Sequence, residues 1–475
     1  MKKLLVIFLL LQSLTACRIK NPSDTRFDAK LPFHNWAPTP PMGWNSWDCY
    51  GPTVVENEVK ANTDYMATNL KKFGWEYIVV DIRWYVANDK SGGYNEKDPV
   101  YNMDNYGRFL PALNRFPSSD NGNGFKPLGD YVHGKGLKFG IHMMRGIPVI
   151  AVNKNTPILG SSARAQDIYT TENQCPWLKD MYTIVAGKPG AQEYYNSLFQ
   201  LYASWGIDFV KVDDLSGRTM EIEMVRKAID NCGRPIVISI SPGGDKPETA
   251  DFLKNNVNMW RTSNDFWDNW PALKNQFIIL NSWAGLGGRG YYPDGDMLPL
   301  GRIGLRAERG EPRWSGFTKE EQYTLMTLFA IFRSPLMFGG DLPGNDVFTL
   351  SLITNRDVLE VNQHNANSRQ LFRKNDLIAW TADDPKTGDK YLALFNASDQ
   401  KPVAESSAIL KSGQSVNVAG PMPADTAVIT VKFEQMGLTG THTITDLWTG
   451  EKLGEFTGQL SRVINRHGCG LYRIH

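Results

Sequence analysis

Short apolar runs that alternate with amphipathic stretches constrain the fold of this chain more than any other feature. Several runs, such as residues 77–81, are almost continuously apolar, as is typical of parallel strands that are buried on both faces. We expect eight strands, at residues 42–44, 77–81, 137–142, 209–213, 236–241, 258–261, 277–281 and 335–338. Eight parallel strands with helices between them are what a closed (β/α)8 barrel requires. The sequence therefore predicts an α/β fold built on a TIM barrel.

Helical patterns fill the gaps between these runs. Val59, Met66 and Leu70 recur at the spacing of one helical face, between the first two expected strands. Further along, Thr318 followed by Glu321 forms the pattern of a capping box, which opens a helix. Both patterns agree with a barrel in which a helix follows each strand.

The pattern changes after about Asn365. Strand-like runs lie at residues 371–380, 390–396, 426–433, 441–446 and 470–474, separated by Gly, Asp and Pro turns. Such runs without long helical stripes predict a small antiparallel β-sandwich. We therefore divide the folded chain into a catalytic barrel over 37–365 and a C-terminal β-sandwich over 366–475. The expected role of the sandwich is to cover one wall of the barrel.

The first residues have the composition of an export signal. A positively charged start, an apolar stretch and small residues before Cys17 predict a signal peptide over residues 1–16. Leu14-Thr15-Ala16-Cys17 also resembles a bacterial lipobox, which implies lipidation of the Cys17 thiol and a tether over residues 17–36. The apolar stretch is too short for a stable membrane span. We expect an exported lipoprotein, periplasmic or on the cell surface, with a plain secretory signal as the alternative.

Composition excludes several other classes of function. A net charge of +1 over 475 residues argues against a nucleic acid partner, which would require a basic face. The cysteines after Cys17 show no Cys-x-x-Cys spacing, so no zinc site or redox pair is predicted, and whether any two form a disulfide is not readable from sequence. We expect no metal and no cofactor.

Two of the expected strands end on a carboxylate. Phe209-Val210-Lys211-Val212-Asp213 and, further along, Trp260-Arg261 leading to Asp265 both carry acidic groups to a strand's carboxyl end. Cleavage of a glycosidic bond needs one carboxyl that attacks or stabilises the sugar carbon and a second that protonates the leaving oxygen. The carboxyl ends of barrel strands share one rim. Asp213 and Asp265 are therefore predicted to be the catalytic pair.

The surroundings of the two carboxylates suggest different protonation states. Lys211 shares strand parity with Asp213, so its cation can favour the ionised carboxylate that a nucleophile requires. Asp214 is the rival nucleophile, but it has the opposite parity. Asp265 must start protonated, and we expect a less solvated setting near the aromatic residues Trp260 and Phe266 to promote this.

Six ordered motifs together resemble glycoside hydrolase family 27, the α-galactosidase family, from about Ala37 to the C-terminus. They are Thr39-Pro40-Pro41-Met42-Gly43-Trp44-Asn45-Ser46-Trp47, Lys211-Val212-Asp213, Arg261-Thr262-Ser263-Asn264-Asp265, Pro293-Asp294-Gly295-Asp296-Met297-Leu298, Ser334-Pro335-Leu336 and Asn355-Arg356-Asp357-Val358. The resemblance implies a retaining, exo-acting enzyme that forms a covalent glycosyl-enzyme. It assigns Asp213 as nucleophile and Asp265 as acid/base.

The resemblance and the rim positions also suggest residues that bind substrate. Trp44 resembles the family's stacking wall, Asp81 and Asp296 resemble its contacts with sugar hydroxyls, and Arg261 would hold hydroxyls or orient the carboxylates. His142 would either contact sugar or be a plain rim residue. The full set of candidates is Trp44, Asp81, Trp84, His142, Lys211, Ser241, Arg261 and Asp296.

Departures from the family pattern leave the sugar open. Typical α-galactosidases have two adjacent aspartates after the second strand, but here Asp81 is followed by Ile82. Ser241 provides only a small group where galactosidases usually have a Glu near the 2-hydroxyl. The substrate is expected to be an oligo- or polysaccharide with a terminal α-galactose. The alternatives are terminal α-N-acetylgalactosamine, β-L-arabinopyranose or an α-glucan end, or a glycan-binding lipoprotein without catalysis.

Overall fold

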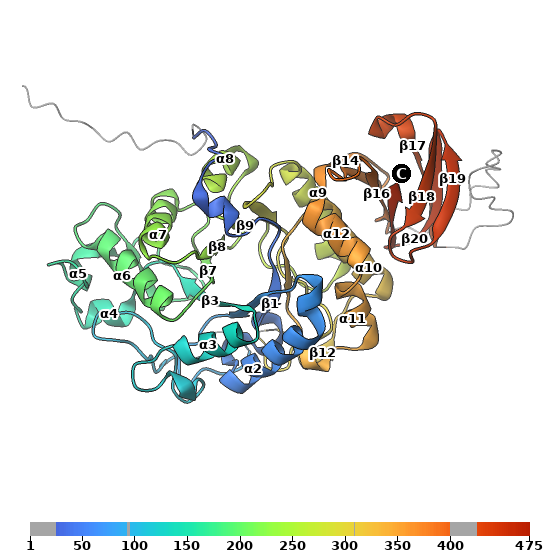
Figure 1. Cartoon of the computed structure of the whole chain (residues 1–475). Coiled ribbons are helices and arrows are strands. Elements are labelled where there is room, and N and C mark those ends of the chain that lie inside the picture. The colour runs from blue at the N-terminus through green and yellow to red at the C-terminus, as the bar shows by residue number, and fades with distance from the viewer. Residues whose placement is uncertain (1–24, 93–95, 308, 400–424) are drawn as a thin grey trace, which may run out of the picture.

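Eight parallel strands form one sheet in which the spatial order follows the chain, in a computed structural model that describes residues 25–92, 96–307, 309–399 and 425–475 (Figure 1). The strands are β1 (Met42–Asn45), β2 (Tyr77–Val80), β3 (Lys138–Met144), β7 (Phe209–Asp213), β8 (Val237–Ile240), β9 (Met259–Arg261), β10 (Tyr292–Asp294) and β13 (Leu336–Phe338). The last strand, β13, pairs with the first, β1. A parallel bridge between Leu298 and Phe338 joins the segment after β10 to β13. The predicted (β/α)8 barrel is confirmed.

Helices lie around this sheet and connect its strands (Figure 1). Their caps agree with the sequence: Thr318 Oγ1 accepts from the Glu321 amide, and the Glu321 carboxylate accepts from the Thr318 amide, so the predicted capping box opens α10. The helices of the barrel part are α1 (Trp47–Tyr50), α2 (Glu56–Tyr65), α3 (Lys126–Gly134), α6 (Ala191–Ser204), α7 (Thr219–Asn231), α8 (Ala250–Lys254), α9 (Trp270–Trp283), α10 (Lys319–Phe332), α11 (Val347–Ile353) and α12 (Arg356–His364).

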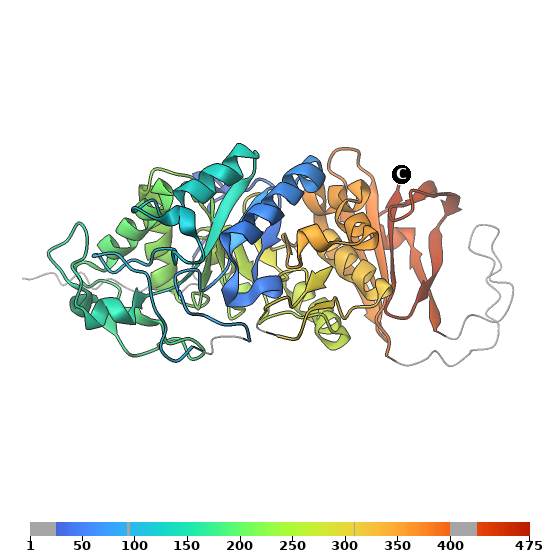
Figure 2. The same cartoon turned by 90° about the horizontal axis from the view of Figure 1, so that it is seen from below.

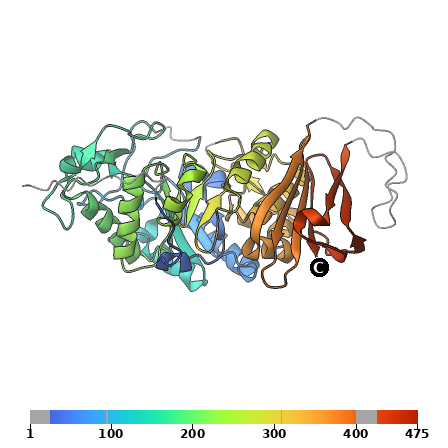
Figure 3. The ribbon, with the colours of Figure 1, turned by 90° about the horizontal axis from the view of Figure 1, so that it is seen from above.

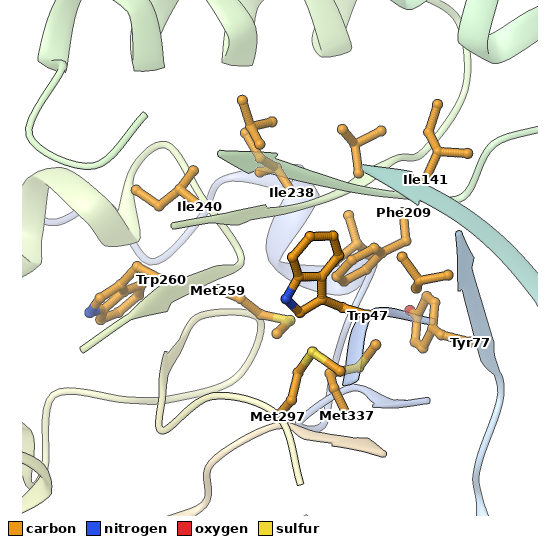
Figure 4. Packing of buried hydrophobic residues seen from close by; sticks show 14 of the residues in the cluster. Trp47, Tyr77, Ile141, Phe209, Ile238, Ile240, Met259, Trp260, Met297 and Met337 are labelled. Carbon is orange, nitrogen blue, oxygen red and sulfur yellow. The ribbon is translucent and has the colours of Figure 1, made fainter. Parts of the chain in front are cut away.

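Burial explains why these runs are strands. Every residue of β2, β8 and β9 is buried, as expected of strands covered on both faces. In β7 only Lys211 and Asp213 are partly exposed, and they alternate with buried valines. Figure 4 shows the core, where Met259, Met297 and Met337 lie around Trp47. The alternation in β7 therefore places the two charged side chains on one face of an otherwise apolar strand.

One predicted strand is wrong. Residues 277–281 lie inside α9, and the seventh barrel strand is β10. Leu273, Phe277 and Leu280 are buried while Ile278 is 59% exposed, which is the spacing of an amphipathic helix. A short apolar run cannot be distinguished from a buried helical segment by periodicity alone.

A long excursion separates β3 from β7. It contains a small antiparallel sheet and two short helices, and it lies at the end of the molecule away from the C-terminal domain (Figures 2 and 3). Its elements are β4 (Ile147–Pro148), α4 (Val149–Asn153), α5 (Ala165–Ile168), β5 (Tyr169–Thr170) and β6 (Met181–Ile184). A second excursion, after β10, forms the hairpin of β11 (Arg302–Ile303) and β12 (Arg313–Trp314).

The C-terminal domain is antiparallel, and the predicted β-sandwich is confirmed. A six-stranded sheet, in the order β14-β15-β16-β21-β18-β19, packs with the pair β17-β20 around its own apolar cluster. The expected strand at 371–380 is in fact two strands joined by a tight turn, and β19 and β20 were not predicted. The strands are β14 (Ala366–Lys374), β15 (Leu377–Asp383), β16 (Lys390–Asn396), β17 (Thr426–Lys432), β18 (Thr441–Asp446), β19 (Lys452–Thr457), β20 (Gln459–Asn465) and β21 (Cys469–Ile474).

This domain packs on the outer helices of the barrel. Thr324 of α10 donates to the His467 carbonyl at 2.6 Å, and the Trp448 indole donates to Thr327 at 2.9 Å. The imidazole of His467 stacks on Trp270 of α9, with ring centroids 3.6 Å apart. The sandwich therefore covers one side of the barrel, as expected.

The N-terminal segment packs on the face where the strands begin. Phe27 lies 5.0 Å from the ring of Tyr291, which precedes β10, and Phe33 and His34 in a short 3-10 turn are buried. The last part of the predicted tether is thus fixed against the barrel. The signal peptide and Cys17 lie outside the described residues. Within the described ranges, no helix has the length and apolar character needed to cross a bilayer.

Candidate active site

A cavity of about 480 Å³ opens where the barrel strands end. Asp81 follows β2, Asp213 ends β7 and Arg261 ends β9, so the cavity lies at the face where catalytic groups gather in this fold. The residues that line it are Trp47, Asp48, Asp81, Trp177, Lys211, Asp213, Pro242, Arg261, Asn264, Asp265, Phe266, Trp267, Asp296, Met297 and Arg309. The volume is of the size that a monosaccharide ring and its first attachment would fill. Both predicted catalytic carboxylates line it.

Asp213 is held by donors on both carboxylate oxygens. Ser241 donates to Oδ1 at 2.9 Å, the Asp214 amide donates to the same oxygen at 3.1 Å, and His142 Nε2 lies 3.2 Å from Oδ2. A carboxylate only accepts, so the His142 ring donates its Nε2 proton there. The Asp213 side chain keeps 15% of its surface exposed, towards the cavity. The Asp213 carboxylate is therefore held in place by hydrogen bonds and is accessible to a ligand from the cavity.

The charge on Asp213 is stabilised by these neighbours. Burial alone raises the pKa of its carboxyl, but the His142 hydrogen bond and the positive charge of Lys211 outweigh burial and hold the pKa below its usual range. Asp213 is therefore ionised at neutral pH, which is the state a nucleophile requires.

Removing His142 tests this assignment. A carboxyl with a lowered pKa stays ionised above that pKa and loses its charge as the pH falls through it. We expect His142→Ala to raise the pKa of Asp213 and move the acidic limb of the kcat/KM profile to higher pH. His133→Ala is the control, because His133 pairs with Asp208 on the outside of the barrel. An acidic limb that does not move in His142→Ala would contradict the prediction.

The rival carboxylate Asp214 faces another partner. It has a positive φ of 57°, and its Oδ2 lies 2.9 Å from Arg145 Nη2. Arg145 is 3% exposed and also pairs with Glu221 at 2.9 Å. Asp214 is absent from the cavity wall. The change of backbone direction after β7 thus points Asp214 away from the cavity and towards Arg145, with which it forms a structural ion pair. Of the two aspartates, Asp213 faces the cavity.

Asp265 also lines the cavity, in a setting that differs from the expectation. Its side chain is 51% exposed, and its Oδ1 accepts from Arg261 Nη2 at 2.9 Å. The predicted poorly solvated environment is wrong, because Phe266 turns into the core while Asp265 turns outward. A bound sugar and its leaving group would cover this carboxyl and remove it from water.

Arg261 connects Asp265 to a second acidic group. Its Nη1 lies 3.2 Å from Asp296 Oδ1, while Asp296 Oδ2 accepts from the Phe266 amide at 2.8 Å. Burial raises the pKa of Asp296, and Arg261 opposes that shift. Behind it, burial and the charge of Asp296 raise the pKa of Asp294 to about 7. Arg261 therefore orients carboxylates, which was one of its two predicted roles.

Asp81 and Lys211 form the floor of the cavity. Lys211 Nζ lies 2.9 Å from Asp81 Oδ2, and the same oxygen accepts from Asn45 Nδ2 at 2.7 Å. Burial raises the pKa of Asp81, but Lys211, His142 and the Asn45 hydrogen bond together outweigh burial and lower that pKa. Lys211 thus supports two carboxylates, Asp81 and Asp213, and its parity with Asp213 is as predicted.

Four predicted substrate-binding residues are missing from the cavity wall. Trp44 is fully buried and its indole donates to the Gly340 carbonyl, so it is no stacking wall. Trp47, three residues on, lines the cavity instead. Trp84 is also buried and donates to the His142 carbonyl. His142 and Ser241 lie behind Asp213 and hold it, as described above. The causes differ: Trp44 and Trp84 are core side chains, whereas His142 and Ser241 reach the site only through Asp213.

Several residues of the cavity were not predicted. Trp177, 38% exposed, reaches the mouth from the excursion between β3 and β7, and Arg309 reaches it from the excursion after β10. Neither carries a sequence signal, because each lies in a loop far from any barrel strand. Trp47 and Asp48 could have been found, since Trp47 ends the motif that begins at Thr39 and Asp48 follows it directly.

Comparison with known proteins identifies the family. The chain matches the family model described as "Alpha galactosidase A" over residues 160–364, and that of the "Alpha galactosidase C-terminal beta sandwich domain" over residues 374–474. The α-galactosidase A of Cellvibrio japonicus (strain Ueda107) is 31% identical over 70% of this chain and 69% of its own length. A solved structure, the GH27 β-L-arabinopyranosidase of Geobacillus stearothermophilus, is 49% identical, covers 94% of this chain and 98% of its own, and has a TM-score of 0.87. The chain belongs to glycoside hydrolase family 27.

Membership in family 27 confirms that the chain is a glycoside hydrolase, and the relatives differ in the sugar they are named for. A further solved structure, a candidate α-N-acetylgalactosaminidase from Bacillus halodurans C-125, is 43% identical over 92% of this chain and 97% of its own, with a TM-score of 0.79. The Geobacillus stearothermophilus enzyme is also known in complex with arabinose, and an α-galactosidase of Saccharomyces cerevisiae that shares the fold, with 18% identity and a TM-score of 0.65, is known with raffinose. The family thus fixes the type of enzyme, and the sugar must be inferred from the cavity.

Proposed function

We propose that this family 27 enzyme is a retaining exo-glycosidase with Asp213 as nucleophile and Asp265 as acid/base. The observation that carries the proposal is an ionised, donor-held Asp213 that lines the same cavity as the exposed Asp265. Asp213 attacks the anomeric carbon while Asp265 gives its proton to the leaving oxygen, so the glycosidic bond breaks and a glycosyl ester forms. Asp265 then takes a proton from water, which attacks the anomeric carbon and releases the sugar and Asp213.

We further propose that the preferred terminal sugar is β-L-arabinopyranose. This sugar has the ring configuration of α-D-galactopyranose without the hydroxymethyl group at C5, so it needs one polar contact fewer. Ile82, in the place of the second family aspartate, is apolar, so this position offers no carboxylate to a hydroxymethyl group. The 49% identity to the Geobacillus stearothermophilus β-L-arabinopyranosidase supports the same sugar.

A terminal α-galactose is the second candidate. It is favoured by the curated α-galactosidases, which include the enzyme of Cyamopsis tetragonoloba at 27% identity over 91% of this chain. The retained Asp81, Lys211 and Arg261 would serve either sugar, because both sugars share the hydroxyl arrangement at C2, C3 and C4.

A panel of 4-nitrophenyl glycosides separates these candidates. We expect kcat/KM for the β-L-arabinopyranoside to exceed that for the α-D-galactopyranoside by about tenfold or more, the discrimination that one unsuitable polar group in a binding site produces. The α-N-acetylgalactosaminide and α-glucoside serve as further comparisons. Ile82→Asp should shift the ratio towards the galactoside. A higher kcat/KM for the galactoside in the wild-type enzyme would contradict the preference for arabinopyranose.

We also propose that the chain is exported and attached to a membrane through lipidated Cys17. The support is the sequence of residues 1–17, together with the packing of Phe27 on the face where the strands begin. That face is opposite the cavity. An anchor there would leave the mouth open to glycans. Metabolic labelling with a fatty acid, lost in Cys17→Ser, is the measurement that checks this.

A further inference from the structure

One carboxyl of the cavity has no assigned part in the chemistry. Asp48, in α1, lines the cavity and is 3% exposed. Its Oδ2 is buried and accepts no hydrogen bond from any residue within the described ranges. By contrast, Asp81, Asp213 and Asp296 each accept at least two hydrogen bonds. A buried polar group without a partner is costly and calls for an explanation.

The backbone around Asp48 is shaped to admit this carboxyl. Gly339, in the loop after β13, lies directly against it, and a methyl group at position 339 would overlap Asp48 Oδ2. The carboxyl therefore occupies space that only a glycine leaves free. Asp296 and Lys211, which line the same cavity, are the charged residues that shift the pKa of Asp48 most.

These neighbours also set its protonation. Burial, and secondly the negative charge of Asp296, raise the pKa of the Asp48 carboxyl well above its usual range, although Lys211 opposes the shift. A neutral carboxylic acid has an O–H donor as well as an acceptor. In that form it can hydrogen-bond a neutral hydroxyl in either direction without adding a further negative charge beside Asp81, Asp213 and Asp296.

We propose that Asp48 is a sugar-binding residue whose carboxyl hydrogen-bonds one hydroxyl of the terminal sugar. This inference deepens the proposed function and rests on it for the choice of sugar. Family 27 members with two aspartates after β2 have a polar contact that this chain lacks at Ile82. Asp48 supplies a polar contact from a different wall of the cavity, and so contributes to the choice of sugar.

Sugar binding measured without turnover tests the inference. Isothermal titration calorimetry with L-arabinose and D-galactose should show that Asp48→Ala weakens the affinity about tenfold, which is the loss expected for one hydrogen bond in a buried site. Asp48→Asn, which keeps a donor and an acceptor of similar size, should stay within about threefold of the wild type. Asp245→Ala is the matched control, because its carboxyl also has a buried oxygen without a partner but lies outside the cavity wall.

Monodeoxy sugars distinguish direct contact from a structural effect. Removal of the hydroxyl that Asp48 contacts should weaken binding to the wild type, and that penalty should vanish in Asp48→Ala, whereas the penalties for other hydroxyls persist. Unchanged penalties for every monodeoxy sugar, or unchanged affinity in a folded Asp48→Ala, would overturn the inference. Failure of the proposed function is seen separately, as a wild-type enzyme that binds sugar but hydrolyses none of the glycosides.

Discussion

Asp213→Asn should lower kcat by at least about 10⁴-fold while leaving the fold and sugar binding intact, as loss of a nucleophile does. The amide has the size of the carboxylate and its oxygen can still accept from Ser241. It cannot form the ester intermediate. The measurement is kcat on an aryl glycoside, together with calorimetric affinity for the free sugar and the thermal unfolding midpoint.

The neighbouring carboxylate provides the control for this experiment. Asp214→Asn removes the ion-pair partner of Arg145 but changes nothing on the cavity wall. We expect Asp214→Asn to keep kcat within about tenfold of the wild type. Substantial activity in Asp213→Asn, with loss in Asp214→Asn, would show that the nucleophile is misassigned.

Asp265→Ala should have an effect that depends on the leaving group. An alkyl or sugar leaving group needs a proton, so kcat/KM for such substrates should fall by about 10³-fold, within the range for general acid catalysis. An aryl leaving group of low pKa departs with little protonation, so the rate of the first step should fall less for an aryl glycoside. Hydrolysis of the glycosyl ester would then be slow, because no base activates water.

Azide completes this test. A small anion can enter the space that the Asp265 side chain leaves and attack the ester without a base. We expect added azide to restore turnover of the aryl glycoside and to yield a glycosyl azide with the anomeric configuration of the substrate, detected by NMR. A uniform loss across leaving groups without rescue, or an inverted product, would contradict a retaining mechanism with Asp265 as acid/base.

The architecture could be predicted because its signals are local. Buried parallel strands such as β2 and β7 are continuous apolar runs, and their ends carry the charged groups. The seventh strand could not be found in this way. β10 has three residues, one of them Pro293, whereas the helix α9 contains the longer apolar run. The residues of β10 form a strand because they pair with β9, although their own sequence gives no clear preference for a strand.

The candidate site was predictable where a residue's position on a strand decides its direction. Asp213 and Lys211 follow from strand parity, and Asp81 follows from the end of β2. Parity does not apply in the short helix after β1, which is why the sequence indicates Trp44 although Trp47 lines the cavity. The sequence also indicates His142 and Ser241 as sugar contacts, because strand position does not show whether a side chain reaches the cavity itself or another residue of the site. His142 points towards the site, but its ring contacts Asp213 from behind and does not line the cavity.

The hydration of Asp265 could not be predicted from its aromatic neighbours. Adjacent residues in a loop can face opposite ways, and here Phe266 is 4% exposed beside a carboxylate that is half exposed. Sequence proximity therefore indicates solvation only where the backbone direction is known.

The excursion between β3 and β7 reaches the mouth of the cavity through Trp177, while the floor is built from strand ends. Insertions or deletions in that excursion can remodel the entrance without disturbing Asp81, Lys211 or Asp213. The residues that would contact the leaving group and those that would contact the terminal sugar therefore lie in separate segments of the chain. Evolution, or an engineer, can alter one of them while the other stays as it is.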